Sequence, residues 1–231
     1  MAIPTKAYIL KINTPISEEY AKTCSDSCDK IGLPWEYHQG YQNMTGKAAW
    51  CLTGIKMKFH EPVRYIPEPS PAQKANATSA GHGAIWKRIA DGPDECVIVL
   101  EHDAIMLHPV CIDIPDHTIG VLGYKVPDPE NYDAQTAGPS ISLLDIDGHE
   151  GAHAYAITKK TAQYLVAEIE KHGVLGAVDN AYFIRGQRRT KIPLKLLDPI
   201  SALGWLRKST IWNHSASRNY NFISSFKKNY K

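Results

Sequence analysis

Glu101 and Asp103 are the residues of this 231-residue chain whose types and spacing most clearly indicate chemistry. They directly follow the continuous apolar run 96–100, which predicts a strand that is buried on both faces. Acids at positions i and i+2 of a strand point the same way, so their charges repel and lose hydration unless a positive group neutralises them. A divalent cation that also binds a diphosphate would do this, and pairing with Lys or Arg is the alternative.

The identity of the expected cation follows from its ligands. Carboxylate oxygens suit Mg²⁺ or Mn²⁺, and the imidazole of His102 between the two acids is better tolerated by Mn²⁺. In open parallel sheets, ligands bind beyond the carboxyl ends of the strands. We therefore expect Glu101, His102 and Asp103 to hold the metal. His214 is a further candidate ligand, with a solvated side chain as its alternative.

The elements that must position these residues follow from periodicity and capping. Residues 7–12 and 35–38 predict strands on either side of a helix over 17–30, which is a parallel βαβ unit. A helix over 80–90, buried strands over 119–124 and 153–157, and a helix over 159–171 follow. The pattern predicts an α/β domain with a mostly parallel central sheet flanked by helices.

The segment from Gly81 to Ala104 resembles glycosyltransferase family 25, which includes lipooligosaccharide and collagen galactosyltransferases and is of the GT-A type. That family shows Ser-His, a Trp four residues after the His, and an apolar strand that ends in Glu-Asp-Asp-Ala. The matching residues are His82, Trp86, Glu101, Asp103 and Ala104, while Gly81 replaces the serine and His102 replaces the middle acid. The resemblance implies a Rossmann-like GT-A domain over residues 1–215.

Three further segments match the family in order and spacing. Ile12-Asn13 looks like its Ile-Asn-Leu, residues 151–160 look like its Gly-x-x-x-Tyr-x-Ile-Ser-Lys, and Val178-Asp179 looks like its Pro-Val-Asp. The family has an arginine in the first helix and a proline at position 177, both of which are absent here. The resemblance covers residues 7–211.

The resemblance implies metal-dependent, inverting transfer of a hexose from a nucleoside-diphosphate sugar, such as a UDP-sugar, to an acceptor hydroxyl. Asp179 is the first candidate for the general base, and a surface helix N-cap is its alternative role. Asp145 and Asp147, which end another apolar run, are the second candidates. The expected acceptor is a glycan, a protein or a lipid-linked sugar.

Several residues are candidates for binding the donor. Basic side chains match phosphate oxygens, and Asn13 lies in the loop that lines the nucleotide in the family. His82 and Trp86 have structural alternatives, a satisfied buried histidine and a packing residue. The substrate-binding candidates are Lys11, Asn13, His82, Trp86, Tyr155, Arg185, Arg188 and Arg189.

Charge is segregated along the chain. Residues 185–231 carry eleven Lys and Arg against one acid, Asp198, whereas the preceding residues have a net charge of −8. A basic surface meets phosphates, so the expected basic tail over 216–231 keeps two alternatives open: a modified base in DNA as the acceptor, and a non-catalytic module that binds nucleotides or nucleic acid.

Composition sets the remaining expectations. A hydrophobic fraction of 43% and a charged fraction of 22% are typical of a globular domain. Since no apolar run approaches the roughly 20 residues of a membrane span and no signal sequence is evident, we expect a cytoplasmic protein. The five cysteines lack zinc-type spacing and predict free thiols.

Overall fold

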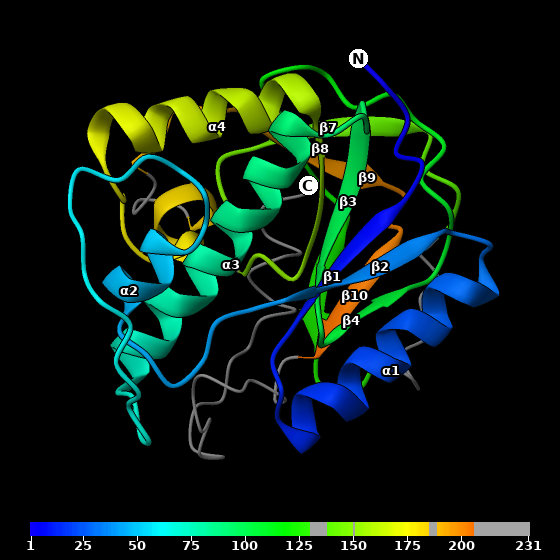
Figure 1. Cartoon of the computed structure of the whole chain (residues 1–231). Coiled ribbons are helices and arrows are strands. Elements are labelled where there is room, and N and C mark those ends of the chain that lie inside the picture. The colour runs from blue at the N-terminus through cyan, green and yellow to red at the C-terminus, as the bar shows by residue number, and fades with distance from the viewer. Residues whose placement is uncertain (130–137, 150, 185–188, 206–231) are drawn as a thin grey trace.

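The chain forms two sheets, with helices on both faces of the larger one (Figure 1). The computed structural model describes residues 1–129, 138–149, 151–184 and 189–205. The helical elements are α1 (Pro15–Lys30), α2 (Gly46–Cys51), α3 (Pro71–Asp91), α4 (Lys159–His172) and one π-helical turn, η1 (Asp179–Phe183). The strands are β1 (Ala7–Lys11), β2 (Trp35–Gln39), β3 (Cys96–Glu101), β4 (Ala104–Met106), β5 (Ile119–Val121), β6 (Gly123–Val126), β7 (Ser142–Ile146), β8 (Ala154–Thr158), β9 (Leu194–Asp198) and β10 (Ala202–Trp205).

The larger sheet has seven strands in the order β2-β1-β3-β8-β5-β9-β7. β2, β1 and β3 are parallel, β8 is antiparallel to both β3 and β5, β9 is parallel to β5, and β7 is antiparallel to β9. Five strands therefore run in one direction and only β8 and β7 oppose them. The α/β class and the mostly parallel sheet flanked by helices are confirmed, as is the opening βαβ unit.

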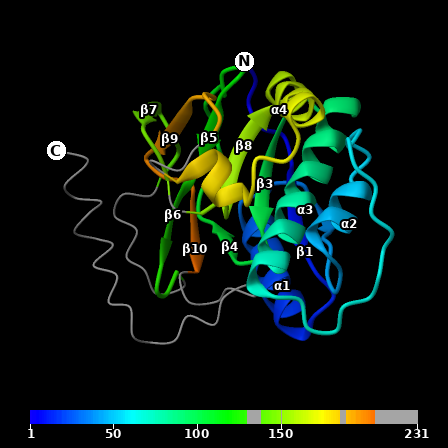
Figure 2. The same ribbon diagram turned by 90° about the vertical axis from the view of Figure 1, so that its left-hand side faces the viewer.

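Alternating side chains of the large sheet build two separate cores. On β1 and β3, Tyr8 and Val99 face the core beneath α3 and α4, whereas Ile9 and Ile98 face the core beneath α1. The smaller sheet, in the order β4-β10-β6, contributes to both cores: Met106 and Ala202 belong to the second, and Val126 and Leu203 to the first. In Figure 2 the small sheet lies to the left of α2 and α3, and β4 contacts α1.

Local capping explains where the helices begin. Ser70 forms a capping box with Gln73, and Pro71 occupies the first turn, so α3 starts well before the expected residue 80. Thr14 rather than Ser17 caps α1, because the Ser17 hydroxyl accepts the Ile12 N–H. α4 begins at Lys159, as predicted, and the Thr158 side chain caps it.

The expected strand over 119–124 is wrong as one element, because the chain leaves one sheet and enters the other at Leu122. The Leu122 N–H donates to Ala154 in the large sheet, while its carbonyl accepts from Ala202 in the small one. A β-carbon on Gly123 would meet the Ala202 oxygen at 1.8 Å, so only glycine permits this close approach. β5 and β6 are therefore separate strands in separate sheets.

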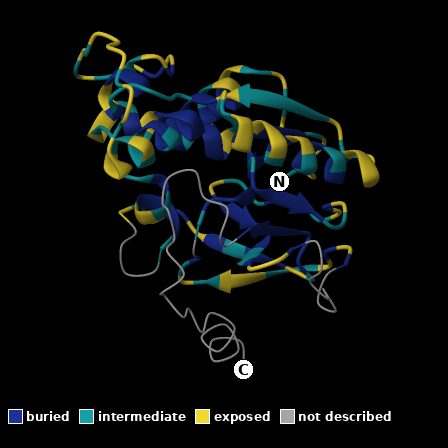
Figure 3. Cartoon of the chain, turned by 90° about the horizontal axis from the view of Figure 1, so that it is seen from below, coloured by how far each residue is buried: buried dark blue, intermediate teal, exposed yellow. Residues whose placement is uncertain are grey.

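Burial follows these layers. Figure 3 shows buried residues on the sheets and on the inner sides of the helices, with exposed residues on the outer sides. All five cysteines are free thiols, as predicted. Within the described ranges, no helix combines the length and apolar character needed to cross a membrane.

Candidate active site

The candidate site lies at the carboxyl end of β3. Glu101 is the last residue of that strand and is paired in register with Leu10 of β1, so the ends of both strands meet there. His102 and Asp103 form the turn into β4. The Asp103 side chain is only 3% exposed, which leaves its carboxylate largely without water. The predicted location at a strand end is confirmed.

Two glycines place His82 beside Glu101. A β-carbon on Gly81 would lie 2.8 Å from the Leu10 side chain, and one on Gly83 would lie 2.4 Å from the Trp50 ring. Because both positions lack a side chain, α3 approaches β1 and α2 closely, and His82 between them is fully buried. The glycine at position 81 thus serves close packing.

A chain of hydrogen bonds fixes the tautomer of His82. The Trp86 indole N–H donates to the Tyr155 hydroxyl at 2.8 Å, and this hydroxyl lies 2.9 Å from His82 Nδ1. His82 Nε2 lies 3.3 Å from Glu101 Oε1. Since an ionised carboxylate only accepts, Nε2 carries the proton, and in the neutral imidazole Tyr155 donates to Nδ1. The chain therefore points a donor at Glu101.

Lys125 of β6 is the positive partner of both acids. Its Nζ lies 3.6 Å from Glu101 Oε2 and 3.5 Å from Asp103 Oδ2. Burial alone would raise the pKa of Glu101, but the charge of Lys125 and the hydrogen bond from His82 outweigh it and hold that pKa well below its usual range. Burial, followed by repulsion from Glu101, raises the pKa of Asp103.

Asp179 joins this group from the start of η1. Burial and then the charge of Glu101 raise the pKa of Asp179 to about 6, although Lys125 and a hydrogen bond from the Ala152 backbone N–H favour its ionised form. Its Oδ1 is shielded from solvent and has no hydrogen-bond partner. An acceptor with a pKa near neutrality and a free lone pair is suited to taking a proton. It does not cap a surface helix.

Two histidines complete the surroundings. The rings of His149 and His153 lie 5.5 Å apart between centroids. Burial and the charge of Lys125 lower the pKa of His149 to about 3, and burial, His149 and Lys125 lower that of His153 well below its usual value. Both are therefore neutral at pH 7. We call the whole set the polar cluster: His82, Glu101, Asp103, Lys125, His149, His153, Tyr155 and Asp179.

The described donor set does not fit a divalent ion as it stands. Among the residues that the structure describes, no three His, Cys, Asp or Glu side chains are arranged to hold a metal. Lys125 already lies against Glu101 and Asp103, and the His102 ring stacks on Tyr20 with 6.2 Å between centroids. His214 lies outside the described residues. The requirement for Mn²⁺ or Mg²⁺ stays a prediction.

The predicted substrate-binding residues divide into three groups. His82, Trp86 and Tyr155 are fully buried. They lie behind Glu101 in a hydrogen-bonded chain, and their contact with substrate stays a prediction. At the strand ends, Lys11 pairs with Glu18, and Asn13 is exposed with its carbonyl accepting from Gln42. Arg189 is exposed, whereas Arg185 and Arg188 lie outside the described residues, as does the tail over 216–231.

The second candidates for the base are not brought to the polar cluster. Asp145 lies on β7, the edge strand, where its Oδ1 is 2.6 Å from Lys195 Nζ and its side chain is 83% exposed. Asp147 follows the same strand and is exposed. Three strands separate β7 from β3, a distance of about 19 Å. Only Asp179 of the three candidates is near Glu101.

Sequence reasoning missed Lys125, His149 and His153. Lys125 follows the buried run 119–123 much as Glu101 follows 96–100, so a charged side chain at the end of an apolar strand was the available signal. The neutral state of the two histidines depends on burial by distant segments. No spacing in the sequence carries that information.

No protein-family model matches this chain, and no curated protein matches it either. Among solved structures, galactosyltransferase LgtC with donor and acceptor sugar analogs has 12% identity and a TM-score of 0.38, with 73% of this chain and 63% of that chain covered. A glycosyltransferase involved in glycosylation of the major capsid of PBCV-1 has 11% identity and a TM-score of 0.37, covering 86% and 93%. GlyE of Streptococcus pneumoniae TIGR4 has 12% identity and a TM-score of 0.34, covering 73% and 39%. The chain thus spans less than two thirds of LgtC and GlyE, and similarity at these scores assigns neither family nor activity.

Proposed function

We propose that this chain is a glycosyltransferase that moves a hexose from a nucleoside-diphosphate sugar to an acceptor hydroxyl with inversion. One observation carries the proposal: Asp179, a half-buried carboxylate whose pKa is raised to about 6, lies in the same cluster as the acids at the end of β3. A base is most effective when its pKa is close to the working pH. The resemblance of segment 81–104 to glycosyltransferase family 25, of the GT-A type, supports the reaction class.

The proposed reaction has one proton transfer and one displacement. The acceptor hydroxyl gives its proton to the carboxylate of Asp179, and the acceptor oxygen forms the new bond to the anomeric carbon. The bond between that carbon and the diphosphate oxygen breaks, and the diphosphate leaves with the electron pair. Attack on the face opposite the leaving group inverts the configuration.

The supporting residues keep the acids in place. The hydrogen-bond chain from Trp86 through Tyr155 and His82 fixes one oxygen of Glu101. An ionised Glu101 in turn keeps the pKa of Asp179 high, because two nearby negative charges disfavour each other. These residues thus keep the pKa of Asp179 high through their effect on Glu101.

Release of the nucleoside diphosphate tests the proposal. The purified protein is incubated with a panel of UDP- and GDP-sugars and a mixture of simple glycosides, with and without Mn²⁺, and the freed nucleoside diphosphate is measured. Release by the native protein and its loss in Asp179→Asn support the transferase. Stabilisation by a nucleotide without release from any donor would instead support the non-catalytic binding module.

The donor and the acceptor are parts of the same proposal. A UDP-sugar and a glycan, protein or lipid-linked acceptor follow from the family that segment 81–104 resembles. A DNA acceptor depends on the basic tail, which lies outside the described residues, and nothing in the described ranges favours it. Binding of the protein to duplex DNA that weakens as the salt concentration rises from about 50 to 200 mM would support a DNA acceptor.

A further inference from the structure

The Lys125 ammonium occupies the position from which a cation would contact both acids. Its distances of 3.6 Å to Glu101 and 3.5 Å to Asp103 are similar, and both exceed the about 2.7–2.9 Å of a tight charge-assisted hydrogen bond. The ammonium therefore lies between the carboxylates and is not locked to either. It keeps hydrogen-bonding capacity for a third anionic partner.

The fold makes specific room for this side chain. A β-carbon on Gly204 would lie 2.9 Å from Lys125 Cγ, and one on Gly151 would lie 3.1 Å from its Cε. The lysine stem thus passes two positions that lack side chains. The Lys125 side chain is 19% exposed, so it is not wholly enclosed by the protein.

The charges that face Lys125 explain why it is needed. Glu101, Asp103 and Asp179 supply the negative charge around it. Burial keeps the neighbouring imidazoles of His149 and His153 neutral, so they supply no full positive charge. Without Lys125 three carboxylates would face one another in a site with little water, which strongly favours capture of a cation. With Lys125 present, a divalent ion would have to bind beside an ammonium group.

We propose that Lys125 takes the place of the divalent cation at this site, neutralising Glu101 and Asp103 and contacting the leaving diphosphate. The first part of this proposal concerns only cation binding, while the contact with diphosphate rests on the proposed function. The native protein should then bind Mn²⁺ weakly and release nucleoside diphosphate in the presence of EDTA. Removing the ammonium should turn the acid pair into a divalent-cation site.

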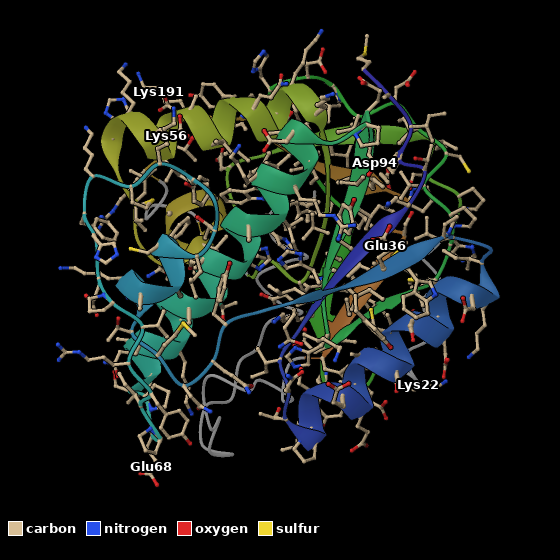
Figure 4. The ribbon with its side chains drawn as sticks, in the orientation of Figure 1. Lys22, Glu36, Lys56, Glu68, Asp94 and Lys191 are labelled. Carbon is tan, nitrogen blue, oxygen red and sulfur yellow. The ribbon has the colours of Figure 1, made fainter. Side chains whose placement is uncertain are left out.

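The test is a thermal-melting titration with MnCl₂ alone, without nucleotide. Lys125→Met keeps the length and the apolar stem but removes the charge. The matched control is Lys6→Met, because Lys6 also lies between two acids, 2.6 Å from Glu36 and 3.4 Å from Asp94, and is 20% exposed. Figure 4 labels Glu36 on β2 and Asp94 before β3. Asp94 precedes the amino end of β3, and that end of the strand lies about 16 Å from Glu101 at its carboxyl end.

The expected result is a gain of metal binding in one variant only. Lys125→Met should bind Mn²⁺ at least about tenfold more tightly than the native protein and should melt several degrees higher with MnCl₂ than with EDTA. Lys6→Met and the native protein should show little change. Equal Mn²⁺ affinity in the native protein and Lys125→Met would overturn the proposal, as would no binding by Lys125→Met.

Two additions keep the test decisive. If Lys125→Met does not fold in EDTA, refolding with MnCl₂ replaces melting: recovery supports the proposal and failure overturns it. Lys125→Arg keeps the charge and should remain insensitive to Mn²⁺. Nucleoside-diphosphate release that is abolished by EDTA in the native protein would overturn the inference while leaving the transferase function intact, whereas absence of release under all conditions would reject only the function.

Discussion

Asp179→Asn removes a charge while keeping the shape of the side chain, and its effect on stability can be worked out from the pKa. The pKa of Asp179 rises from 3.8 to about 6 on folding, so the folded protein holds this proton more tightly than the unfolded chain. The protonated Asp179 therefore favours the folded protein; this contribution to the free energy of unfolding is complete below about pH 4 and is lost as the pH rises through about 6. A pKa shift of about two units means that at pH 8 the ionised Asp179 destabilises the folded protein by about 3 kcal/mol.

The asparagine variant should therefore be more stable than the native protein at pH 8, by up to about 3 kcal/mol, and equally stable at pH 4. Urea unfolding at the two pH values measures both quantities. The same variant should lose nucleoside-diphosphate release by about 10²-fold or more, because it cannot accept the proton. In the native protein, kcat/KM should fall about tenfold per pH unit below about 6. A variant that is less stable at pH 8 would show that the Asp179 carboxylate is not strained by its surroundings.

Three further substitutions test the surroundings of the site. Trp86→Phe should cost about 1–3 kcal/mol in unfolding free energy measured in urea, because it removes the buried donor to Tyr155. Gly204→Ala should lower the melting temperature and the turnover together, since its β-carbon would lie 2.7 Å from the His153 ring; an unchanged melting temperature would show that the ring can move aside. Asp145→Asn should leave nucleoside-diphosphate release within about twofold of the native value, because this side chain is exposed on an edge strand, and a large loss would restore it as a candidate base.

The strand and the helix that position the site could be predicted because the sequence patterns that specify them are local. A continuous apolar run gives β3, and the abrupt change of polarity marks its carboxyl end at Glu101. The predicted helix over 159–171 is also bounded locally, by the Thr158 cap and by Gly173, whose φ is 84°. Each of these features depends on residues within one element, so a single sequence contains the information.

The features that were missed depend on segments that are far apart. Lys125 reaches Glu101 only because the chain changes sheets at Leu122 and continues into β6 of the small sheet. The sequence leaves open that the two acids pair with Lys or Arg, but no spacing identifies Lys125 as the partner. The early start of α3 was missed because Pro71 closes a proline-rich stretch, although proline is favoured in the first turn of a helix.

The burial of His82, Trp86 and Tyr155 was also beyond local reasoning. Histidine and aromatic residues are equally at home in a core and in a ligand site, so their types alone did not distinguish the two roles. Their full enclosure follows from the close approach of α3 to β1, which Gly81 permits. The glycine that looked like a departure from the family is thus the physical reason for the placement.

The two sheets carry opposite charges of the same ion pair, Glu101 on β3 in the large sheet and Lys125 on β6 in the small one. A sliding motion of the small sheet by about 1 Å would change the Coulomb attraction at Glu101 and, through it, the proton affinity of Asp179. The proton affinity of Asp179 thus depends on how the small sheet is positioned against the large one, because Glu101 and Lys125 both act on its pKa.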